Sequence, residues 1–435
     1  MKKILLFGAG KSATCLIQYL VRATAARDWQ LVVAESNLSL VQSKIGPATH
    51  ARAAVLQVED EGQRDALIRE ADIVISLLPP ALHYLVAGSC IRWKKNLLTA
   101  SYLDDKIRAL EPAIREQGLL FICEMGLDPG IDHMSAMELI HRIRSQAGII
   151  HSFRSHTGGL VSPGSDDNPW HYKISWNPRN VVLAGSAGAT YRQEGQVITR
   201  SYPELFDRCE EVVVEDIGPL AWYPNRDSLS YISLYGLEET STFIRTTLRY
   251  PSFCRAWQAV VRAGLTDDST PVRDAGEGAP APPLTFAAWA APILPFVNES
   301  NRPQLEFLGL FDQTPIPSAT PWTSADVLQY LLETRLAMQP DDKDMIVMLH
   351  EIEFENAAGT RKEIHSRLIV HGEDSLRTAM AKTVGLPLGI AAVLLLEGKI
   401  GLQGLHIPIL PAIYEPVLRE LALEGIRFEE TERPV

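Results

Sequence analysis

The sequence contains few cysteines, and these are widely separated. Its five cysteines form no CxxC motif and no cluster with histidine. A disulfide framework and a zinc site of the usual ligand spacing are therefore excluded, and we expect no metal. An odd number of thiols is typical of a reducing compartment, so the expected localisation is cytoplasmic.

An excess of positive charge is also missing. The chain has 41 Lys and Arg against 53 Asp and Glu, a formal net charge of −12. Nucleic-acid binding depends on a basic face, so we expect no nucleic-acid partner. A small anionic substrate is still compatible with this balance, because a few local arginines are enough to bind it.

Long apolar runs are absent as well. The run near the N-terminus has about five apolar residues and is interrupted by glycines, unlike the core of a signal peptide. The longest later run, "GIAAVLLLEG" at 389–398, is too short to cross a bilayer. We therefore expect a soluble protein without a membrane partner.

What the sequence does contain is a regular alternation of strand and helix patterns over residues 1–130. Short apolar segments end near residues 8, 36, 80, 102 and 126, and helical patterns separate them. This alternation predicts an α/β domain with a doubly wound parallel sheet. At 435 residues the chain is longer than one core usually supports, so we expect a second domain.

The motif "GAGKSA", Gly8 to Ala13, follows the first predicted strand and precedes a helical pattern. In that context a GxGxxA motif indicates a dinucleotide-binding turn. Gly8 permits the tight turn, Gly10 lets the backbone approach a diphosphate, and Ala13 is small enough for helix–strand packing. The helix N-terminus would face the phosphates. An ordinary glycine-rich turn is the alternative.

The second predicted strand ends at Glu35, and Ser36 and Asn37 follow it without an arginine. A carboxylate at this position can accept hydrogen bonds from both hydroxyls of an adenosine ribose, and it repels a 2′-phosphate. The sequence therefore favours NAD over NADP. A solvated Glu35 is the alternative interpretation, and Ser36 and Asn37 are also able to bind a phosphate.

Polar residues crowd into "EMGLDPGIDHM", residues 124–134, directly after an apolar run. The segments "SLLPPALH" (76–83) and "TASY" (99–102) likewise follow predicted strands. Ligands of parallel sheets bind beyond the carboxyl ends of the strands. We therefore expect these three segments to form the rim where the nicotinamide and the substrate meet.

The later sequence predicts a mixed α+β domain. Residues 131–264 form its first part, 265–340 a helical insertion with a Pro- and Ala-rich surface connection, and 341–374 an antiparallel hairpin. Residues 375–435 read as helices that return to the first domain, and Pro387 kinks or restarts one of them. Ser324 is the expected N-cap of a helix in the insertion.

Two arginines in polar segments of this domain are candidates for binding carboxylates. Arg226 lies in "YPNRDSLSY" and Arg249 at the end of a predicted strand, "TTLRY". A guanidinium donates two parallel hydrogen bonds to a planar anion. Pairing of Arg226 with neighbouring Asp227 is the structural alternative. The segment 158–185, which contains Lys173, is expected to be a shaped loop.

Taken in order, these motifs resemble the glutamate-forming saccharopine dehydrogenase family, also called saccharopine reductases. The resemblance rests on "GAGKSA", "SLLPPALH", "TASY", "GLDPGIDHM", "DNPWHYKISW", "YPNRDS" and "TTLRY", and extends more weakly to "AKTVGLPLGIA". It implies a homodimer with a variant Rossmann domain and a substrate-binding and dimerisation domain. The implied reaction of lysine metabolism converts saccharopine, water and NAD or NADP into L-glutamate and aminoadipate semialdehyde, or the reverse.

The resemblance also implies site residues. The implied substrate contacts are Ser101, Tyr102, Asp128, Arg226, Thr247, Leu248 and Arg249. The implied cofactor contacts are Gly8, Gly10, Lys11, Ser12, Ala13, Glu35, Ser36, Leu78, Ala100, Ser101, Leu127, Asp128 and Pro129. Two positions depart from the fungal pattern: Glu35–Ser36 replaces a phosphate-binding arginine, and Thr157 replaces a cysteine, so no role of that thiol transfers.

The chemistry needs groups that hold carboxylates and a group that moves protons. Arg226 and Arg249 are expected to fix the substrate, which lowers the barrier by positioning. Asp128 is the expected base at the substrate amine, and Tyr102 a hydrogen-bond donor or proton relay. His133 and Lys173 are further candidates, each with a structural alternative.

Two other functions are compatible with part of this pattern. One is a sister enzyme that forms another secondary amine, such as carboxynorspermidine, although two carboxylate-binding arginines speak against it. The other is a nucleotide-binding sensor on an inactive dehydrogenase fold, and the retention of Asp128, Tyr102 and both arginines speaks against it.

Overall fold

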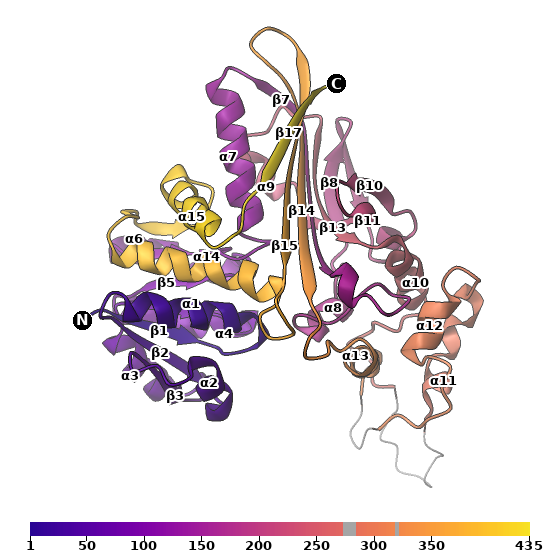
Figure 1. Cartoon of the computed structure of the whole chain (residues 1–435), viewed down its shortest axis with the longest axis horizontal. Coiled ribbons are helices and arrows are strands. Elements are labelled where there is room, and N and C mark those ends of the chain that lie inside the picture. The colour runs from indigo at the N-terminus through magenta and orange to yellow at the C-terminus, as the bar shows by residue number, and fades with distance from the viewer. Residues whose placement is uncertain (273–283, 318–321) are drawn as a thin grey trace. The chain divides into compact units, whose positions relative to one another are not determined.

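The computed structural model describes residues 1–272, 284–317 and 322–435, and these divide into two compact units (Figure 1). Unit 1 comprises Met1–Ile149 and Leu376–Glu429, and unit 2 comprises Ile150–Ser375 and Glu430–Val435. The expected boundary at residue 130 falls too early, because helix α7 (Ile131–Ser145) belongs to unit 1. The last six residues belong to unit 2, which the sequence analysis did not anticipate.

Unit 1 is built on a seven-stranded parallel sheet, as the alternation of patterns predicted. Its strand order is β16 (Gly404–His406), β6 (Leu120–Ile122), β5 (Asn96–Thr99), β4 (Ile73–Ser76), β1 (Lys3–Phe7), β2 (Gln30–Glu35) and β3 (Ala51–Val55). The register aligns Phe7 with Ser76, and Ser76 with Thr99. The carboxyl ends of these strands therefore lie along one edge of the sheet, where the glycine loop and the two polar segments begin.

Ten helices accompany this sheet in the described part of unit 1. They are the 3-10 turn η1 (Lys11–Ala13), α1 (Thr14–Ala25), α2 (Leu38–Ile45), α3 (Glu61–Glu70), α4 (Pro80–Arg92), α5 (Asp105–Arg108), α6 (Glu111–Glu116), α7, α14 (Ala379–Leu396) and α15 (Pro411–Leu423). The prediction of an α/β fold is confirmed.

Helix α14 packs closely on α1 within unit 1. A Cβ at Gly385 would lie 2.9 Å from Leu16, and one at Gly389 would lie 2.7 Å from Tyr19, so two glycines permit the approach. Pro387 lies inside one continuous helix. By length and composition α14 could cross a membrane, but 78% of this segment is buried, as in the core helix of a globular domain.

Unit 2 contains a ten-stranded mixed sheet. Its main path runs through β10 (Glu210–Val214), β11 (Gly218–Pro224), β13 (Thr242–Arg249), β7 (Ile149–Val161), β14 (Asp344–Glu355), β15 (Arg361–His371) and β17 (Glu429–Pro434), with β8 (Ala189–Gln193), β9 (Gln196–Arg200) and β12 (Arg226–Asp227) beside it. Strands β7 and β13 are parallel. Strands β14 and β15 form the expected antiparallel hairpin, and β17 runs along its outer edge (Figure 1).

The helices of unit 2 include the expected insertion. They are η2 (Pro163–Ser165), α8 (Pro178–Val182), η3 (Pro203–Phe206), α9 (Ser230–Tyr235), α10 (Pro251–Arg262), α11 (Phe286–Trp289), η4 (Ala291–Phe296), α12 (Arg302–Leu308) and α13 (Ser324–Arg335). The N-cap of α13 is Thr323 in a capping box with Asp326, one residue before the predicted Ser324. Part of the predicted surface connection, 273–283, lies outside the described residues.

Candidate active site

The glycine loop of unit 1 has the backbone that a dinucleotide requires. Gly8 has a φ of +99°, and a Cβ there would lie 2.5 Å from the carbonyl oxygen of Leu77, so only glycine fits. A Cβ at Gly10 would meet no atom within 4 Å, which leaves the backbone open to a ligand. Ala13 is fully buried. The residues present therefore fit a dinucleotide diphosphate.

Glu35 is turned toward its own chain rather than outward. Its Oε2 accepts a hydrogen bond from the backbone N–H of Ala9 at 3.0 Å, and its Oε1 accepts from the N–H and hydroxyl of Ser36 at 2.8 and 2.9 Å. Burial alone would raise the pKa of Glu35, but these hydrogen bonds outweigh it and lower the pKa. The Glu35 carboxylate supports the glycine loop. It is therefore less available to ribose hydroxyls than the preference for NAD assumed.

His83, in α4, links the ends of two neighbouring strands, β4 and β5. Its Nδ1 lies 2.8 Å from Ser76 Oγ, and its Nε2 lies 2.7 Å from Ser101 Oγ and 3.3 Å from Thr99 Oγ1. Burial lowers the pKa of His83 to about 4, against a small opposing effect of Asp104. The ring is therefore neutral at pH 7 and holds the Ser101 hydroxyl in place. Sequence reasoning missed this role, because a histidine in an apolar helix gives no specific signal.

The low pKa of His83 predicts a pH dependence of stability. Because the folded-state pKa lies below the ordinary value of 6.5, stability is complete above pH 6.5 and is lost as the pH falls toward 4, by at most about 3 kcal/mol. We expect His83→Gln to flatten the change of the urea midpoint between pH 6.5 and 4. His406→Gln, at a half-buried histidine of the same unit, is the matched control. An identical slope in wild type and His83→Gln would contradict this assignment.

The predicted catalytic pair meets at the rim of unit 1. The hydroxyl of Tyr102 donates to Asp128 Oδ1 at 3.2 Å, across 26 positions of sequence. Both side chains are half-buried, and Ser101 next to them is held by His83. Leu78 and Ala100 are also half-buried, and Leu127 and Pro129 are buried. The structure thus brings Tyr102 and Asp128 together, with Ser101 adjacent in the chain, and the roles of these residues stay predictions.

The remaining polar residues of the 124–134 segment are mainly structural. Glu124, with a φ of +58°, accepts from the N–H of Leu103 at 3.0 Å and lies 2.8 Å from Nε2 of His133. Asp132 Oδ1 accepts from the N–H of Gly130 at 2.6 Å. Glu124 and His133 are almost completely buried. This hydrogen-bonded group fixes the loop that carries Asp128, and it favours the structural alternative for His133.

In unit 2, Arg249 is a buried cation. Its side chain lies 5.2 Å from the ring of Tyr172 and 5.4 Å from the ring of Phe253, and its Nη1 donates to the carbonyl oxygen of Leu248 at 2.8 Å. Within the part of the chain that the structure describes, Arg249 has no carboxylate partner and its Nε has no hydrogen-bond partner. A buried guanidinium stays charged, so an anionic group beside Arg249 would stabilise it.

Three hydroxyl-bearing residues share the face of the sheet with Arg249. In the register Thr247 lies opposite both Tyr223 and Thr157. The hydroxyl of Thr157 is buried and has no hydrogen-bond partner among the described residues. Leu248 points to the opposite face, where it packs with Leu160 and other core residues, so only its backbone is able to reach a ligand on the Arg249 face.

Arg226 lies on the short strand β12 beside β8, and its side chain is exposed. It has a φ of +53°, a conformation that is uncommon for residues other than glycine and that concentrates at functional sites. Asp227 accepts a hydrogen bond from the N–H of Leu229 at 2.8 Å. Sequence reasoning missed the buried Arg245, whose carbonyl oxygen accepts from the N–H of Asn225 at 2.8 Å and so supports the turn before Arg226.

Lys173 has a structural role. Its Nζ donates to Asp167 at 2.8 Å and to Asp342 at 2.7 Å, and these bonds outweigh burial and raise its pKa. Trp170 is fully buried and donates to the carbonyl oxygen of Gln304 at 2.7 Å. The predicted loop is therefore confined to the residues between β7 and α8, and ion pairs and an aromatic core fix it.

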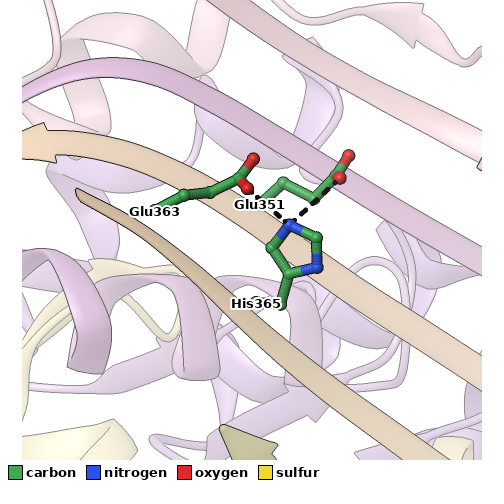
Figure 2. A group of neighbouring side chains, drawn as sticks. All are labelled: Glu351, Glu363 and His365. Atoms are coloured by element: carbon green, nitrogen blue, oxygen red, sulfur yellow. Dashed lines mark ion pairs between the residues drawn. The ribbon is translucent and has the colours of Figure 1, made fainter. Parts of the chain in front are cut away.

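The sequence analysis did not anticipate a cluster of Glu351, Glu363 and His365, whose ligand-type atoms lie within 4.8 Å of one another (Figure 2). However, Arg433 of β17 donates to Glu363 at 3.0 Å and to Nε2 of His365 at 2.7 Å. His156 Nε2 lies 2.9 Å from Oε2 of Glu351, the oxygen that does not face His365. The cluster is thus an ion-pair network in which an arginine already occupies the position of a cation.

A glycine loop and a tyrosine–aspartate pair at the carboxyl edge of one parallel sheet are typical of dinucleotide-dependent oxidoreductases. Residues 4–122 match the saccharopine dehydrogenase NADP binding domain, and residues 126–426 match the saccharopine dehydrogenase C-terminal domain. The chain belongs to the saccharopine dehydrogenase family. The preference for NAD that we derived from Glu35 finds no support in this match.

Individual relatives agree with this assignment. The chain is 31% identical to the NADP+-dependent, L-glutamate-forming saccharopine dehydrogenase of Schizosaccharomyces pombe, over 99% of both chains. It is similar to the apo structure of the L-glutamate-forming enzyme of Saccharomyces cerevisiae, with a TM-score of 0.88, 32% identity and full coverage of both. It is 33% identical to the mitochondrial α-aminoadipic semialdehyde synthase of Bos taurus, but spans only 47% of that protein.

Proposed function

We propose that this chain is an L-glutamate-forming saccharopine dehydrogenase that uses NADP. The reaction converts saccharopine, NADP+ and water into L-glutamate, aminoadipate semialdehyde, NADPH and a proton, or the reverse. The observation that carries the proposal is Arg249, a buried guanidinium without a carboxylate partner among the described residues. A substrate with three carboxylates supplies the missing anion.

The residues of unit 1 fit the other requirements of the reaction. Gly8, Gly10 and the start of η1 would hold the diphosphate, and Glu35 supports that loop. When bound, the dinucleotide supplies the acceptor or donor of the hydride. Asp128 accepts the proton that the substrate amine loses as its C–N bond becomes an imine. The hydroxyl of Tyr102 orients the Asp128 carboxylate and moves a proton as water adds.

The reduced-nicotinamide absorbance of the purified protein with saccharopine, in parallel with NADP and NAD, tests this proposal. Reduction by saccharopine with NADP as the better acceptor is expected. Turnover of a carboxylated polyamine in place of saccharopine would assign the chain to the sister enzymes, which the matched families do not favour. Tight cofactor binding without turnover on any secondary amine would instead indicate a sensor.

Arg226 is expected to bind a second substrate carboxylate. Arg226→Ala should raise the KM for saccharopine by about ten-fold or more, because a charged hydrogen-bond donor is lost. Arg200→Ala is the matched control, because Arg200 is exposed on neighbouring β9, opposite Ala189, the residue that pairs with Arg226. Unchanged steady-state kinetics in Arg226→Ala would remove this residue from the site.

We further propose a cytoplasmic homodimer. The free cysteines, four of them buried, fit a reducing compartment, and the family resemblance implies the dimer. Light scattering on the purified protein measures the assembly directly, and a mass near the 48.1 kDa of one chain would contradict it.

A further inference from the structure

Lys44, near the end of α2, lies against the glycine loop. Its Nζ donates to the carbonyl oxygen of Ala9 at 2.7 Å and to that of Gly10 at 2.6 Å. Throughout the described residues no carboxylate forms an ion pair with Lys44, and its side chain is half-buried. The loop that binds a dinucleotide thus carries a cation that only backbone carbonyls hold.

The charge of this lysine is incompletely compensated. Burial lowers the pKa of Lys44 to about 8, while Cys15 and Glu35 oppose the shift to a smaller extent. Glu35 is the nearby carboxylate, but Ala9 and Ser36 already donate to both of its oxygens. Protonated Lys44 would therefore gain from a further anion beside the glycine loop.

We propose that Lys44 recognises the 2′-phosphate of NADP and makes this chain prefer NADP over NAD. The phosphate is a monoester with nearly two negative charges at pH 7, and it is the group by which the two dinucleotides differ. The adenosine ribose of a dinucleotide binds near the end of the second strand, next to the first glycines of the loop. Lys44 supplies the cation there that the residues directly after β2, Ser36 and Asn37, do not.

This inference rests on the proposed use of a dinucleotide, and it removes the conflict between Glu35 and the NADP-binding family. Glu35 repels a 2′-phosphate only if its charge is uncompensated. Hydrogen bonds from the loop and the nearby ammonium group of Lys44 reduce that repulsion. An acid at the end of β2 is then compatible with NADP.

Fluorescence titration of NADPH and NADH, without saccharopine, measures this preference directly. Wild type is expected to bind NADPH at least ten-fold more tightly than NADH. Lys44→Met should weaken NADPH binding about ten-fold and NADH binding less than two-fold. Lys44→Arg keeps the charge and should keep most of the preference.

Lys11→Gln is the matched control, because Lys11 lies in the glycine loop and is expected to serve the diphosphate that both cofactors share. It should weaken both cofactors equally. Equal weakening of both by Lys44→Met would show that Lys44 only supports the loop and would overturn the proposal, as would a wild type that prefers NADH. Selective NADPH binding without saccharopine turnover would refute the proposed reaction and leave the role of Lys44 intact.

A pH series provides a second readout. Between pH 7 and 9 the free protein loses the charge of Lys44, so the ratio of NADPH to NADH affinity should fall by up to about ten-fold. The titratable groups whose charge acts on Lys44 are Cys15 on α1 and Glu35 on β2. These remain in Lys44→Arg, so a slope that persists in this variant would belong to them and contradict the assignment to Lys44.

Discussion

Replacing Asp128 by asparagine is expected to lower kcat for saccharopine oxidation by about 10² to 10⁴, the usual contribution of a positioned acid–base group. The expected change in KM is less than about three-fold, because Arg226 and Arg249 rather than Asp128 are the residues proposed to hold the substrate carboxylates. Asparagine has nearly the same shape and can still accept the hydrogen bond from Tyr102 at Oδ1. The loss would therefore be one of proton transfer and not of packing.

Two further variants distinguish a base from a structural residue. Tyr102→Phe removes the donor that orients Asp128 and should lower kcat less than Asp128→Asn does. Asp132→Asn alters a buried carboxylate that accepts a hydrogen bond from the N–H of Gly130, two positions away in sequence, and it should reduce thermal stability more than kcat. Near-normal turnover of Asp128→Asn would exclude Asp128 as the base.

The fold was predictable because its parallel sheet is buried and its helices are amphipathic. Strands such as β1 and β4 are mostly apolar, and Gly8 or Pro79 follows within three residues, which gives them clear ends. Strand β17 gave no such signal, since all six of its residues are exposed and it contains Pro434. Its pairing with β15 depends on contacts such as those of Arg433, which no local pattern encodes.

The candidate site was predictable from the sequence only where its residues directly follow the end of a predicted strand. Asp128 and Tyr102 follow strand ends, so the sheet brings them together. The role of Glu35 was not predictable, because it depends on which N–H groups its carboxylate accepts from. Lys44 and His83 lie in helices without a motif, and only the packing of α2 and α4 brings them to the loop and to Ser101.

Replacing Arg249 by methionine is expected to have opposite effects on substrate binding and on stability. Methionine keeps the contacts with Tyr172 and Phe253 but removes the charge. Loss of one partner of a buried charge pair costs about 2–5 kcal/mol, so kcat/KM for saccharopine should fall by about 30-fold to several thousand-fold. The affinity for NADPH should stay unchanged.

The stability of the substrate-free protein separates this role from a structural one. A buried guanidinium without a carboxylate partner among the described residues costs desolvation energy, so Arg249→Met should raise the Tm without substrate. Saccharopine should raise the Tm of wild type by mass action and leave that of Arg249→Met nearly unchanged. Arg249 is a structural residue if Arg249→Met has a lower Tm than wild type and saccharopine raises the Tm of both proteins equally. The stability gained in Arg249→Met measures the desolvation cost of the buried Arg249 charge. A substrate carboxylate would have to offset this cost on binding.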